Sequence, residues 1–410
     1  MATLHAFRAL RPKPTHAERI ASVPYDVVST DEARRLAAGN DHSFLHVIRP
    51  EIDLPPGTDE HADAVYQMGR DNMLRFAKSD YTLVEDAPSV YIYRLTMDGR
   101  AQTGIFGCVS VKDYDANVIL KHELTRPAKE DDRTRHILEQ EAHAEPVMLT
   151  YRDESRVDEI VTAATEQAPL YDFTSEDGVG HTVWRIPSPG DLVELFSSIP
   201  KLYVADGHHR CKAASRAAAD VAEGGGIDSA PEVGFFPAVL FPMSNMLIMP
   251  YNRIIRELPS DSERFLNVLS ERYGLVPSNA ATPGGKGNVC LYVNGSWYQM
   301  ELPVSSASGA ASNLDVARLG EFVLEPVLGI TDPRRDARID FVGGIRGTSE
   351  LERLVNSGKA AAAISMYATG IDELVSVSDA GELMPPKSTW FEPKLRSGLL
   401  VHPFGQRMLT

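Results

Sequence analysis

Hydrophobic and polar positions change period from segment to segment along the chain, which predicts a mixture of helices and strands. Over residues 61–79 the apolar positions recur at helical spacing. Residues 89–96 and 102–111 instead form two strand-like runs, with a turn signal at Asp98-Gly99 that is typical of a hairpin. The segment Ser29-Thr30-Asp31-Glu32 is typical of a helix start. The first part of the chain is therefore expected to be a mixed α+β structure.

The rest of the chain continues this alternation. Residues 147–151 and 202–206 are short apolar runs typical of buried strands, and the second leads directly into an alanine-rich helical pattern. A helix is expected in the second half of residues 121–141, ended by Glu145-Pro146. The other expected elements are a hairpin at 178–180, the end of the alanine-rich helix at 217–226, two strands within 237–252, a loop at 278–287, strands at 289–293, 297–302 and 359–366, and helices at 313–330 and 348–357.

Length and composition indicate a globular protein of two or three domains, because 410 residues with 43% hydrophobic content can bury a large core. We expect an N-terminal α+β region at 1–118, a central region at 119–275 and a C-terminal α+β region at 276–410. Residues 1–14 contain no apolar signal core, and no run approaches the roughly 20 apolar residues of a membrane span. We therefore expect a cytoplasmic protein.

The charge balance limits the classes of partner. A formal net charge of −16 opposes general binding to nucleic acids or anionic membranes, because like charges repel. Small molecules or proteins are the expected partners, and a homodimer is left open. Cys108, Cys211 and Cys290 are widely spaced and include no Cys-x-x-Cys pair, so neither a disulfide framework nor a zinc site is indicated.

The most informative segment is the passage from strand to helix at Asp206-Gly207-His208-His209-Arg210. A helix start presents unpaired backbone N–H groups and the positive end of the helix dipole, to which His208, His209 and Arg210 add protonatable or cationic groups. Gly207 allows the backbone to approach an anion closely. These features predict a site for a phosphate or carboxylate. The alternative is an Asp-Gly turn followed by solvated polar residues.

A second group of charged residues lies upstream, at Lys121, His122, Glu123 and Arg126. A carboxylate can accept a proton from a substrate hydroxyl, and cations can neutralise the charge on a transferred phosphoryl group. The group is therefore a candidate part of a phosphoryl-transfer site. The alternative is a solvated helix face.

Two C-terminal segments carry further candidates. Residues 332–344 combine alternating charges with Gly343-Gly344, as in an ion-paired structural corner or a third anion-binding element. Residues 384–395 place basic and hydroxyl side chains around Trp390 and Phe391, between prolines that stiffen the backbone. The second segment either lines a ligand site or packs as a C-terminal arm.

Distinctive motifs are spread over nearly the whole chain. They are Phe7-Arg8-Ala9-Leu10-Arg11-Pro12, Val23-Pro24-Tyr25-Asp26-Val27, Ser43-Phe44-Leu45-His46-Val47, Lys121-His122-Glu123-Leu124-Thr125-Arg126, Ala205-Asp206-Gly207-His208-His209-Arg210, Tyr251-Asn252-Arg253, Asp340-Phe341-Val342-Gly343-Gly344-Ile345-Arg346 and Pro385-Pro386-Lys387-Ser388-Thr389-Trp390-Phe391. Together these motifs resemble the domain-of-unknown-function 1015 family. One departure is Leu124, where the family more usually has a polar residue, and it puts in doubt only the role of that position.

The order of three features also resembles the nucleotide-binding core shared by ParB-type CTPases, sulfiredoxins and free serine kinases. These features are a His-Glu pair, a strand, and an Asp-Gly-His-His-Arg turn that opens a helix. The resemblance implies such a core for residues 119–275, with the turn holding nucleotide phosphates. Sulfiredoxin chemistry is not expected, because His209 rather than a cysteine precedes Arg210. ParB-like DNA binding is not expected, because the chain is acidic.

The resemblance to the serine kinases implies an ATP- or ADP-dependent phosphotransferase acting on a small hydroxylated metabolite, with free L-serine as the leading acceptor. Glu123 is then the base, Asp206 holds Mg²⁺ or orients a histidine, and His208 is the third expected catalytic residue. The expected cofactor-binding residues are Lys121, His122, Arg126, Gly207, His208, His209 and Arg210. The residues expected to close the site or bind a substrate carboxylate are Asn252, Arg253, Lys387 and Ser388.

Two alternative functions belong to other classes. A nucleotide-responsive regulatory switch would bind nucleotide without phosphoryl transfer. A metal-dependent phosphoester hydrolase would use His122, His208, His209 and Asp206 as ligands. Tightly retained Zn²⁺ or Mn²⁺ would favour the hydrolase, whereas loosely held Mg²⁺ would favour the kinase.

Overall fold

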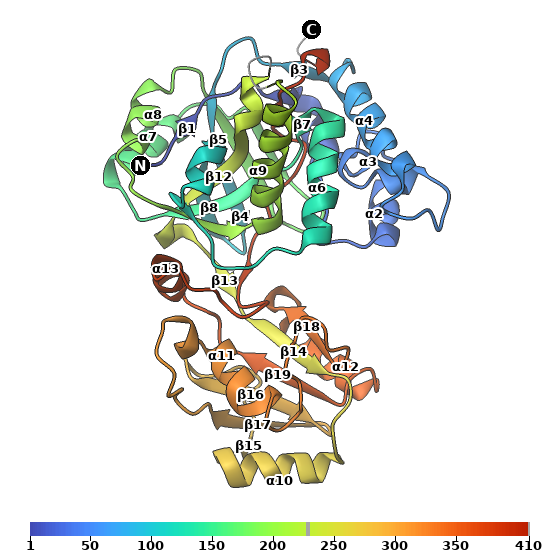
Figure 1. Cartoon of the computed structure of the whole chain (residues 1–410), viewed down its shortest axis with the longest axis vertical. Coiled ribbons are helices and arrows are strands. Elements are labelled where there is room, and N and C mark those ends of the chain that lie inside the picture. Colours follow the sequence, from blue (N-terminus) through green and yellow to red (C-terminus); the bar gives the residue numbers. More distant parts are fainter. Residues whose placement is uncertain (227–229, 409–410) are drawn as a thin grey trace. The chain divides into compact units, whose positions relative to one another are not determined.

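The computed structural model describes residues 1–226 and 230–408, and the chain divides into two compact units (Figure 1). Unit 1 comprises Met1–Met246 and Pro393–Thr410, and unit 2 comprises Leu247–Glu392. The division does not coincide with the three expected regions, because the expected boundary after residue 118 falls inside unit 1 and that after residue 275 falls inside unit 2. In the described part of the chain, no helix is both long and apolar enough to cross a membrane.

Unit 1 is built on a mixed sheet in the strand order β6-β11-β8-β12-β5-β4-β10-β9, with β1 also paired to β5. The pairs β6–β11 and β8–β12 are parallel, and the other neighbours are antiparallel. The strands are β1 (Leu4–His5), β4 (Val90–Met97), β5 (Arg100–Ser110), β6 (Ile119–Leu120), β8 (Val147–Tyr151), β9 (Tyr171–Thr174), β10 (Gly180–Ile186), β11 (Leu202–Asp206) and β12 (Phe235–Pro242). Together with the helices, this sheet confirms the expected α+β class.

Two clusters of buried apolar side chains stabilise unit 1. One joins the sheet to residues of α5, α7, α8 and α9, and the other joins residues of α1, α2, α3 and α4. The helices are α1 (Ala17–Ile20), α2 (Thr30–Ala37), α3 (Leu45–Ile48), α4 (Asp63–Ala77), α5 (Val111–Asp115), α6 (Pro127–Gln140), α7 (Ser155–Thr165), α8 (Gly190–Phe196) and α9 (His208–Glu223). Two short strand pairs, β2 (Leu10–Pro12) with β3 (Thr82–Val84) and β7 (Ala142–His143) with β21 (His402–Pro403), complete the unit.

Local sequence signals account for several element boundaries. Asp98 and Gly99 both have positive φ and join β4 to β5, as the hairpin prediction requires. The Ser29 hydroxyl accepts the backbone N–H of Glu32, whose carboxylate accepts the backbone N–H of Ser29, and this capping box starts α2 as predicted. The predicted end of α6 at Glu145-Pro146 is wrong, because the helix stops at Gln140 and Glu141 adopts a left-handed conformation.

Unit 2 contains a second sheet in the order β15-β17-β16-β19-β14-β18 and a short pair, β13 with β20. Its strands are β13 (Ile248–Met249), β14 (Tyr251–Ile255), β15 (Val276–Ser278), β16 (Asn288–Val293), β17 (Ser296–Glu301), β18 (Ile339–Gly343), β19 (Ala362–Met366) and β20 (Trp390–Phe391). Its helices are α10 (Ser262–Tyr273), α11 (Asp315–Leu319), α12 (Gly347–Asn356) and α13 (Ile371–Asp379). The continuous helix expected at 313–330 is wrong, because α11 gives way to a π-helical turn at Gly320–Leu324.

A buried polar cluster in unit 1 links the C-terminal segment to the sheet. The Nε–H of Arg396 donates to Nε2 of His181 at 3.3 Å, and Nδ1 of His181 lies 2.8 Å from the Tyr93 hydroxyl. Nε2 is therefore the acceptor, and the neutral ring carries its proton on Nδ1. Burial, together with the charge of Arg396, lowers the pKa of His181 to about 3. His181 is thus a neutral structural residue across the physiological pH range.

The buried neutral histidines predict that acid destabilises unit 1. Burial also lowers the pKa of His143 to about 3. Below about pH 6.5 these histidines become protonated in the unfolded chain but stay neutral in the folded chain. The free energy of unfolding therefore falls as the pH drops from about 6.5 toward 3, by about 1.4 kcal/mol per pH unit for each ring. Urea denaturation at pH 7, 6 and 5 should show a shallower pH slope for His181→Gln than for the wild type. Identical pH slopes in the variant and the wild type would contradict the assignment of His181 as a buried neutral histidine.

Candidate functional site

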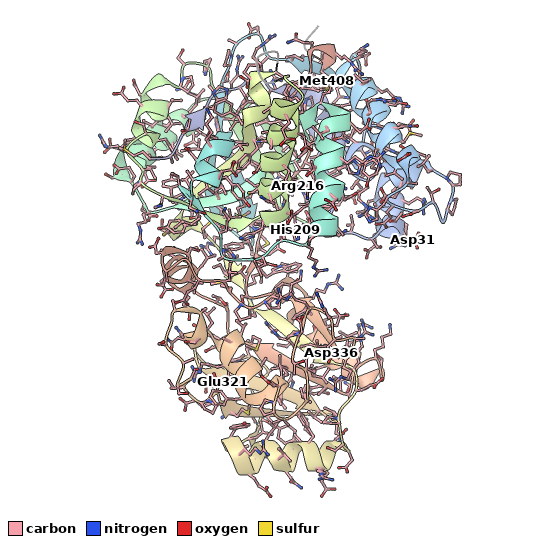
Figure 2. The ribbon with its side chains drawn as sticks, in the orientation of Figure 1. Asp31, His209, Arg216, Glu321, Asp336 and Met408 are labelled. Carbon is pink, nitrogen blue, oxygen red and sulfur yellow. The ribbon has the colours of Figure 1, made fainter. Side chains whose placement is uncertain are left out.

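The candidate site lies where β11 ends and α9 begins. Gly207 joins them with a φ of +104°, a conformation that side-chain-bearing residues avoid. A Cβ atom at this position would lie 3.0 Å from Cγ1 of Val147, so a side chain here would be crowded. The N-cap residue of α9 is Gly207, which has no side chain with which to cap the first backbone N–H groups of the helix. Figure 2 shows His209 at this end of α9 and Arg216 farther along it.

A second helix start lies beside the first. The backbone N–H of Arg126, the residue before α6, donates to Nε2 of His209 at 3.1 Å. One helical turn farther along α6, Glu130 pairs with Arg216 of α9 at 3.2 Å. Contacts that advance together along both helices require α6 and α9 to run parallel, and the two appear side by side in Figure 1. Two helix N-termini therefore converge at one place. Neither Arg126 nor Gly207 caps its helix through its own side chain, and His209 accepts the backbone N–H of Arg126.

The histidines of the turn are neutral. His122 and His208 are buried with their ring centroids 4.4 Å apart in an edge-to-face arrangement, and the backbone N–H of His122 points to Nε2 of His208 at 3.5 Å. Burial lowers the pKa of His122 to about 4 and the pKa of His208 well below its usual value. Burial and the nearby Arg126 also lower the pKa of His209. Their expected positive charges are therefore not present at neutral pH.

Arg210 turns inward rather than toward solvent. It is 8% exposed, its Nη2 donates to Oδ2 of Asp206 at 3.1 Å, and its Nη1 donates to the Pro146 carbonyl. Burial alone would lower the pKa of Arg210, but the carboxylates of Asp26, Asp206 and Glu145 outweigh it and raise the pKa. The charge of Arg210 is thus balanced by the protein's own carboxylates, and the side chain fixes the geometry of the turn.

Glu145 and Asp26 were missed by the sequence analysis as site residues. Oε1 of Glu145 accepts the backbone N–H of Tyr25 at 3.1 Å and the Ser397 hydroxyl at 3.2 Å. Burial is the main cause that raises the pKa of Glu145. Because the Tyr25 backbone binds to Glu145, the adjacent Asp26 is held where its carboxylate influences Arg210. The signal for Asp26 was present in the Val-Pro-Tyr-Asp motif, whereas Glu145-Pro146 was interpreted only as a helix end.

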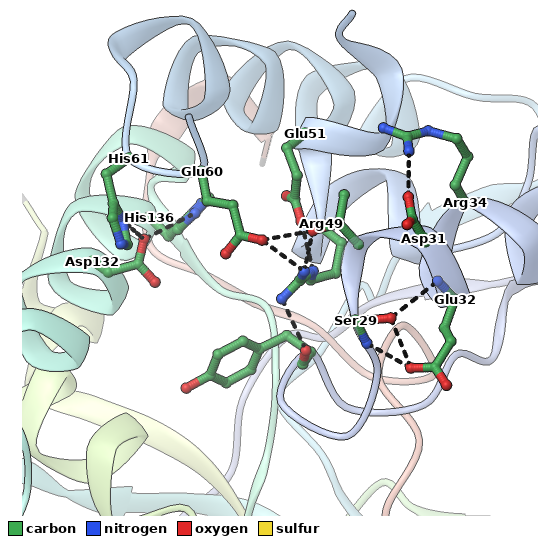
Figure 3. Close-up of polar contacts among 12 residues, drawn as sticks. Ser29, Asp31, Glu32, Arg34, Arg49, Glu51, Glu60, His61, Asp132 and His136 are labelled. Carbon is green, nitrogen blue, oxygen red and sulfur yellow. Dashed lines mark hydrogen bonds and ion pairs between the residues drawn. The ribbon is translucent and has the colours of Figure 1, made fainter. Parts of the chain in front are cut away.

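A surrounding network of arginines fixes the Tyr25 segment. The guanidinium of Arg133 lies 4.0 Å from the centroid of the Tyr25 ring and pairs with Asp132 at 2.7 Å. Nη1 of Arg49 donates to the Tyr25 carbonyl at 3.3 Å. Arg49 pairs in turn with Glu51 at 2.6 Å and with Glu60 at 3.5 Å (Figure 3). Both the backbone N–H and the carbonyl of Tyr25 are therefore hydrogen-bonded, to Glu145 and Arg49 respectively.

The more accessible groups near the turn are carboxylates and a lysine. The side chain of Asp206 is 31% exposed, and Nζ of Lys394 lies 3.8 Å from its Oδ2. Glu123 follows the buried His122 and is partly exposed. Lys121 places its ammonium 4.1 Å from the centroid of the Tyr114 ring of α5, and burial lowers its pKa. Lys394 was not among the expected site residues, although the segment 384–395 was singled out.

Unit 2 brings together the four residues expected to bind a carboxylate. Arg253 is 3% exposed and donates to the carbonyls of Tyr251 and Lys387, so it contacts the Pro-Pro-Lys-Ser segment directly. Ser388 donates to the Pro385 carbonyl at 2.6 Å. Burial lowers the pKa of Arg253 to about 10, and within the described residues no carboxylate forms an ion pair with it. Asn252 serves the sheet instead, because its Oδ1 accepts the backbone N–H of Met366 at 2.9 Å.

Asp206 is the residue that was expected to hold Mg²⁺. Over residues 1–226 and 230–408, no group of three or more His, Cys, Asp or Glu residues is placed to hold a metal ion. Mg²⁺ commonly binds through one or two carboxylates together with substrate phosphates, so a single partly exposed carboxylate fits that mode of binding. The chain's three cysteines are buried and free.

Comparison with models of protein families assigns the chain to one family. The family described as "Protein of unknown function (DUF1015)" matches residues 4–317, and the chain belongs to this family. No curated protein matches the sequence.

Three solved structures show a distant likeness. A conserved hypothetical protein from Pyrococcus furiosus is 10% identical and aligns over 71% of this chain and 93% of its own, with a TM-score of 0.36. A free serine kinase in complex with AMP is 10% identical over 72% and 91%, with a TM-score of 0.37. SbnI with a C-terminal truncation, from Staphylococcus aureus, is 12% identical over 72% and 87%, with a TM-score of 0.38. Likenesses at this level assign no activity to the chain.

Gly207→Ala tests the tightness of the turn. The added Cβ would meet Val147 while the backbone holds a left-handed φ, so we expect the free energy of unfolding to fall by roughly 1–3 kcal/mol. Gly190→Ala is the matched control, because its Cβ would meet nothing within 4 Å and its φ is not positive. Urea denaturation of the two variants measures the difference. Equal midpoints for Gly207→Ala and the wild type would show that the turn is not constrained as described.

Proposed function

We propose that this DUF1015 member is a nucleotide-dependent phosphotransferase acting on a small hydroxylated metabolite. The observation that carries the proposal is the convergence of two parallel helix N-termini, neither capped by the side chain of its own N-cap residue, beside the left-handed Gly207. Backbone N–H groups and aligned helix dipoles at such a place favour phosphate oxygens. Because the three histidines are neutral, these backbone groups are the main source of attraction for an anion at the turn.

The proposed roles differ from residue to residue. The first N–H groups of α9, with His209 and Arg126 beside them, contact the nucleotide phosphates. His122, His208 and Arg210 act as positioning residues, because they are buried and support the turn from within. Lys121 and Lys394 supply positive charge near the same strand ends, and Gly207 allows the left-handed turn that leads into α9.

Glu123 is the proposed general base. The substrate hydroxyl attacks the terminal phosphorus of the nucleotide, a new O–P bond forms and the bridging O–P bond breaks. The hydroxyl proton passes to the carboxylate of Glu123, and ADP leaves from ATP, or AMP from ADP. Asp206 is the residue that would hold Mg²⁺, which neutralises phosphate charge when it is bound. Free L-serine is the first acceptor to test, because the sequence resembles the serine kinases around this turn.

In unit 2, Arg253 is the proposed anion-binding group, with Lys387 and Ser388 beside it. A buried guanidinium without a carboxylate partner costs several kcal/mol unless an anion neutralises it. A small molecule's carboxylate would supply that missing charge. Asn252 is the neighbour that holds the strand in register rather than a direct ligand.

A regulatory switch is the second candidate function. The observation that favours it is that the cation of the turn, Arg210, is already balanced by carboxylates, which leaves less charge to stabilise a transferring phosphoryl group. Nucleotide binding without product, together with a nucleotide-dependent change in sedimentation, would favour the switch. For the metal-dependent hydrolase, the described residues include no cluster of three or more potential ligands, so no observation favours it.

Glu123→Gln tests the phosphotransferase. We expect the variant to lose phosphoryl transfer by about 100-fold or more, because the hydroxyl proton has no acceptor, and to keep its affinity for nucleotide. Purified protein is incubated with Mg²⁺ and ATP, then ADP, against hydroxylated amino acids and sugars, and the phosphorylated product is followed by mass spectrometry.

Glu159→Gln is the matched control, because Glu159 is an exposed residue on α7 away from the turn. It should turn over at the wild-type rate. Unchanged turnover in Glu123→Gln would remove Glu123 from the mechanism, and absence of product with every acceptor would count against phosphotransfer itself.

A further inference from the structure

Unit 2 contains a groove that the proposed function does not use. It has a volume of about 610 Å³ and lies between the β14–β18 edge of the sheet and α12. The segment Asp340 to Arg346, singled out in the sequence for its charges and paired glycines, forms much of its wall. Volumes between about 300 and 1,000 Å³ are usual for small-molecule sites. The groove is therefore large enough for an organic ligand rather than a single ion.

The lining of the groove carries an excess of positive charge. Four cationic side chains, Arg256, Arg346, Arg353 and Lys359, face two carboxylates, Asp340 and Glu350. The excess of two positive charges contrasts with the net charge of −16 of the whole chain. A local reversal of sign in a concave surface concentrates anions there.

Two of these cations are not used by the protein. Arg256 pairs with Asp340 at 2.8 Å, and Arg353 holds both carboxylate oxygens of Glu350 at 2.6 and 2.7 Å. Within the described residues, Arg346 and Lys359 form no ion pair or hydrogen bond through their side chains. Both nevertheless lie close enough to Glu350 to help lower its pKa, after the larger effect of Arg353. The two unpaired cations therefore face the same part of the groove.

Trp390 gives the groove an aromatic part of its lining. Trp390 packs so closely on β18 that a Cβ atom on Gly343 would lie 2.6 Å from the indole. The indole N–H donates to Glu392 at 2.7 Å, and the ring meets Tyr251 edge to face at 5.0 Å. Close packing therefore explains the glycine at position 343, because a larger residue would displace Trp390. The lining of the groove combines an aromatic ring with cations that suit phosphate oxygens.

We propose that this groove binds a small phosphorylated molecule, with Arg346 and Lys359 as the groups that contact its phosphate. Because the contacts are between charged groups, binding is expected to weaken as the salt concentration rises. The site is distinct in its residues from the helix starts of unit 1 and from Arg253. It stands whether or not unit 1 transfers a phosphoryl group.

Isothermal titration of the full chain with inorganic pyrophosphate tests the groove. We expect the double variant Arg346→Gln/Lys359→Gln to bind at least about tenfold more weakly than the wild type, because both unpaired cations are removed. The charge-preserving double variant Arg346→Lys/Lys359→Arg should restore binding. Arg335→Gln is the matched control and should leave affinity unchanged, because Arg335 is exposed in the same unit and does not line the groove.

The titration distinguishes binding in the groove from binding at the turn of unit 1. Gly207→Ala, tested in the same titration, should leave the component that depends on Arg346 and Lys359 in place. Equal pyrophosphate affinity in the wild type and the Gln double variant would overturn the proposal. So would the absence of saturable binding in the wild type, or an equal loss of affinity in Arg335→Gln.

Discussion

A buried guanidinium, that of Arg210, organises the passage from strand to helix on which the candidate site depends. Removing such a charge from water is expensive, and the structure offsets the cost with carboxylates from three parts of the chain, at Asp26, Glu145 and Asp206. The Pro146 carbonyl completes its contacts. Because the guanidinium needs these partners together, the turn, the start of β8 and the Tyr25 segment are positioned by one interaction. Gly207 then sets the direction in which α9 leaves the strand.

This arrangement changes the chemistry that the sequence alone implied. Three adjacent basic residues suggested a cluster of positive charges, yet two of them are neutral histidines and the third is balanced internally. In the proposed site, attraction for an anion then comes chiefly from backbone N–H groups at the start of α9. Such dipoles are fixed by the fold and do not titrate, so anion binding at the turn would be less sensitive to pH than a histidine cluster would be.

Features governed by neighbouring residues were predictable from the sequence, and those governed by distant contacts were not. Asp98-Gly99 marks a hairpin because positive φ is required at both positions, and the strand-turn-helix at residue 206 follows from a change in hydrophobic period. By contrast, Asp26, Glu145 and Lys394 join the site through contacts with residues far away in the sequence. The burial of His208 against His122 is likewise invisible in a pattern of residue types. Helices α7, α8, α10 and α13 were not predicted.

The two proposed anion sites of this acidic chain differ in the source of their attraction for an anion. At the turn of unit 1, internal carboxylates balance the charge of Arg210, so the backbone N–H groups supply the remaining attraction for an anion. In the groove of unit 2 the balance is reversed, because Arg256 and Arg353 neutralise both carboxylates and leave Arg346 and Lys359 unpaired. Salt distinguishes the two: exposed side-chain charges are screened within a Debye length of about 8 Å at physiological ionic strength, whereas hydrogen bonds from buried backbone groups are screened less. A phosphate held by N–H groups at the turn should therefore survive salt that releases one from the groove.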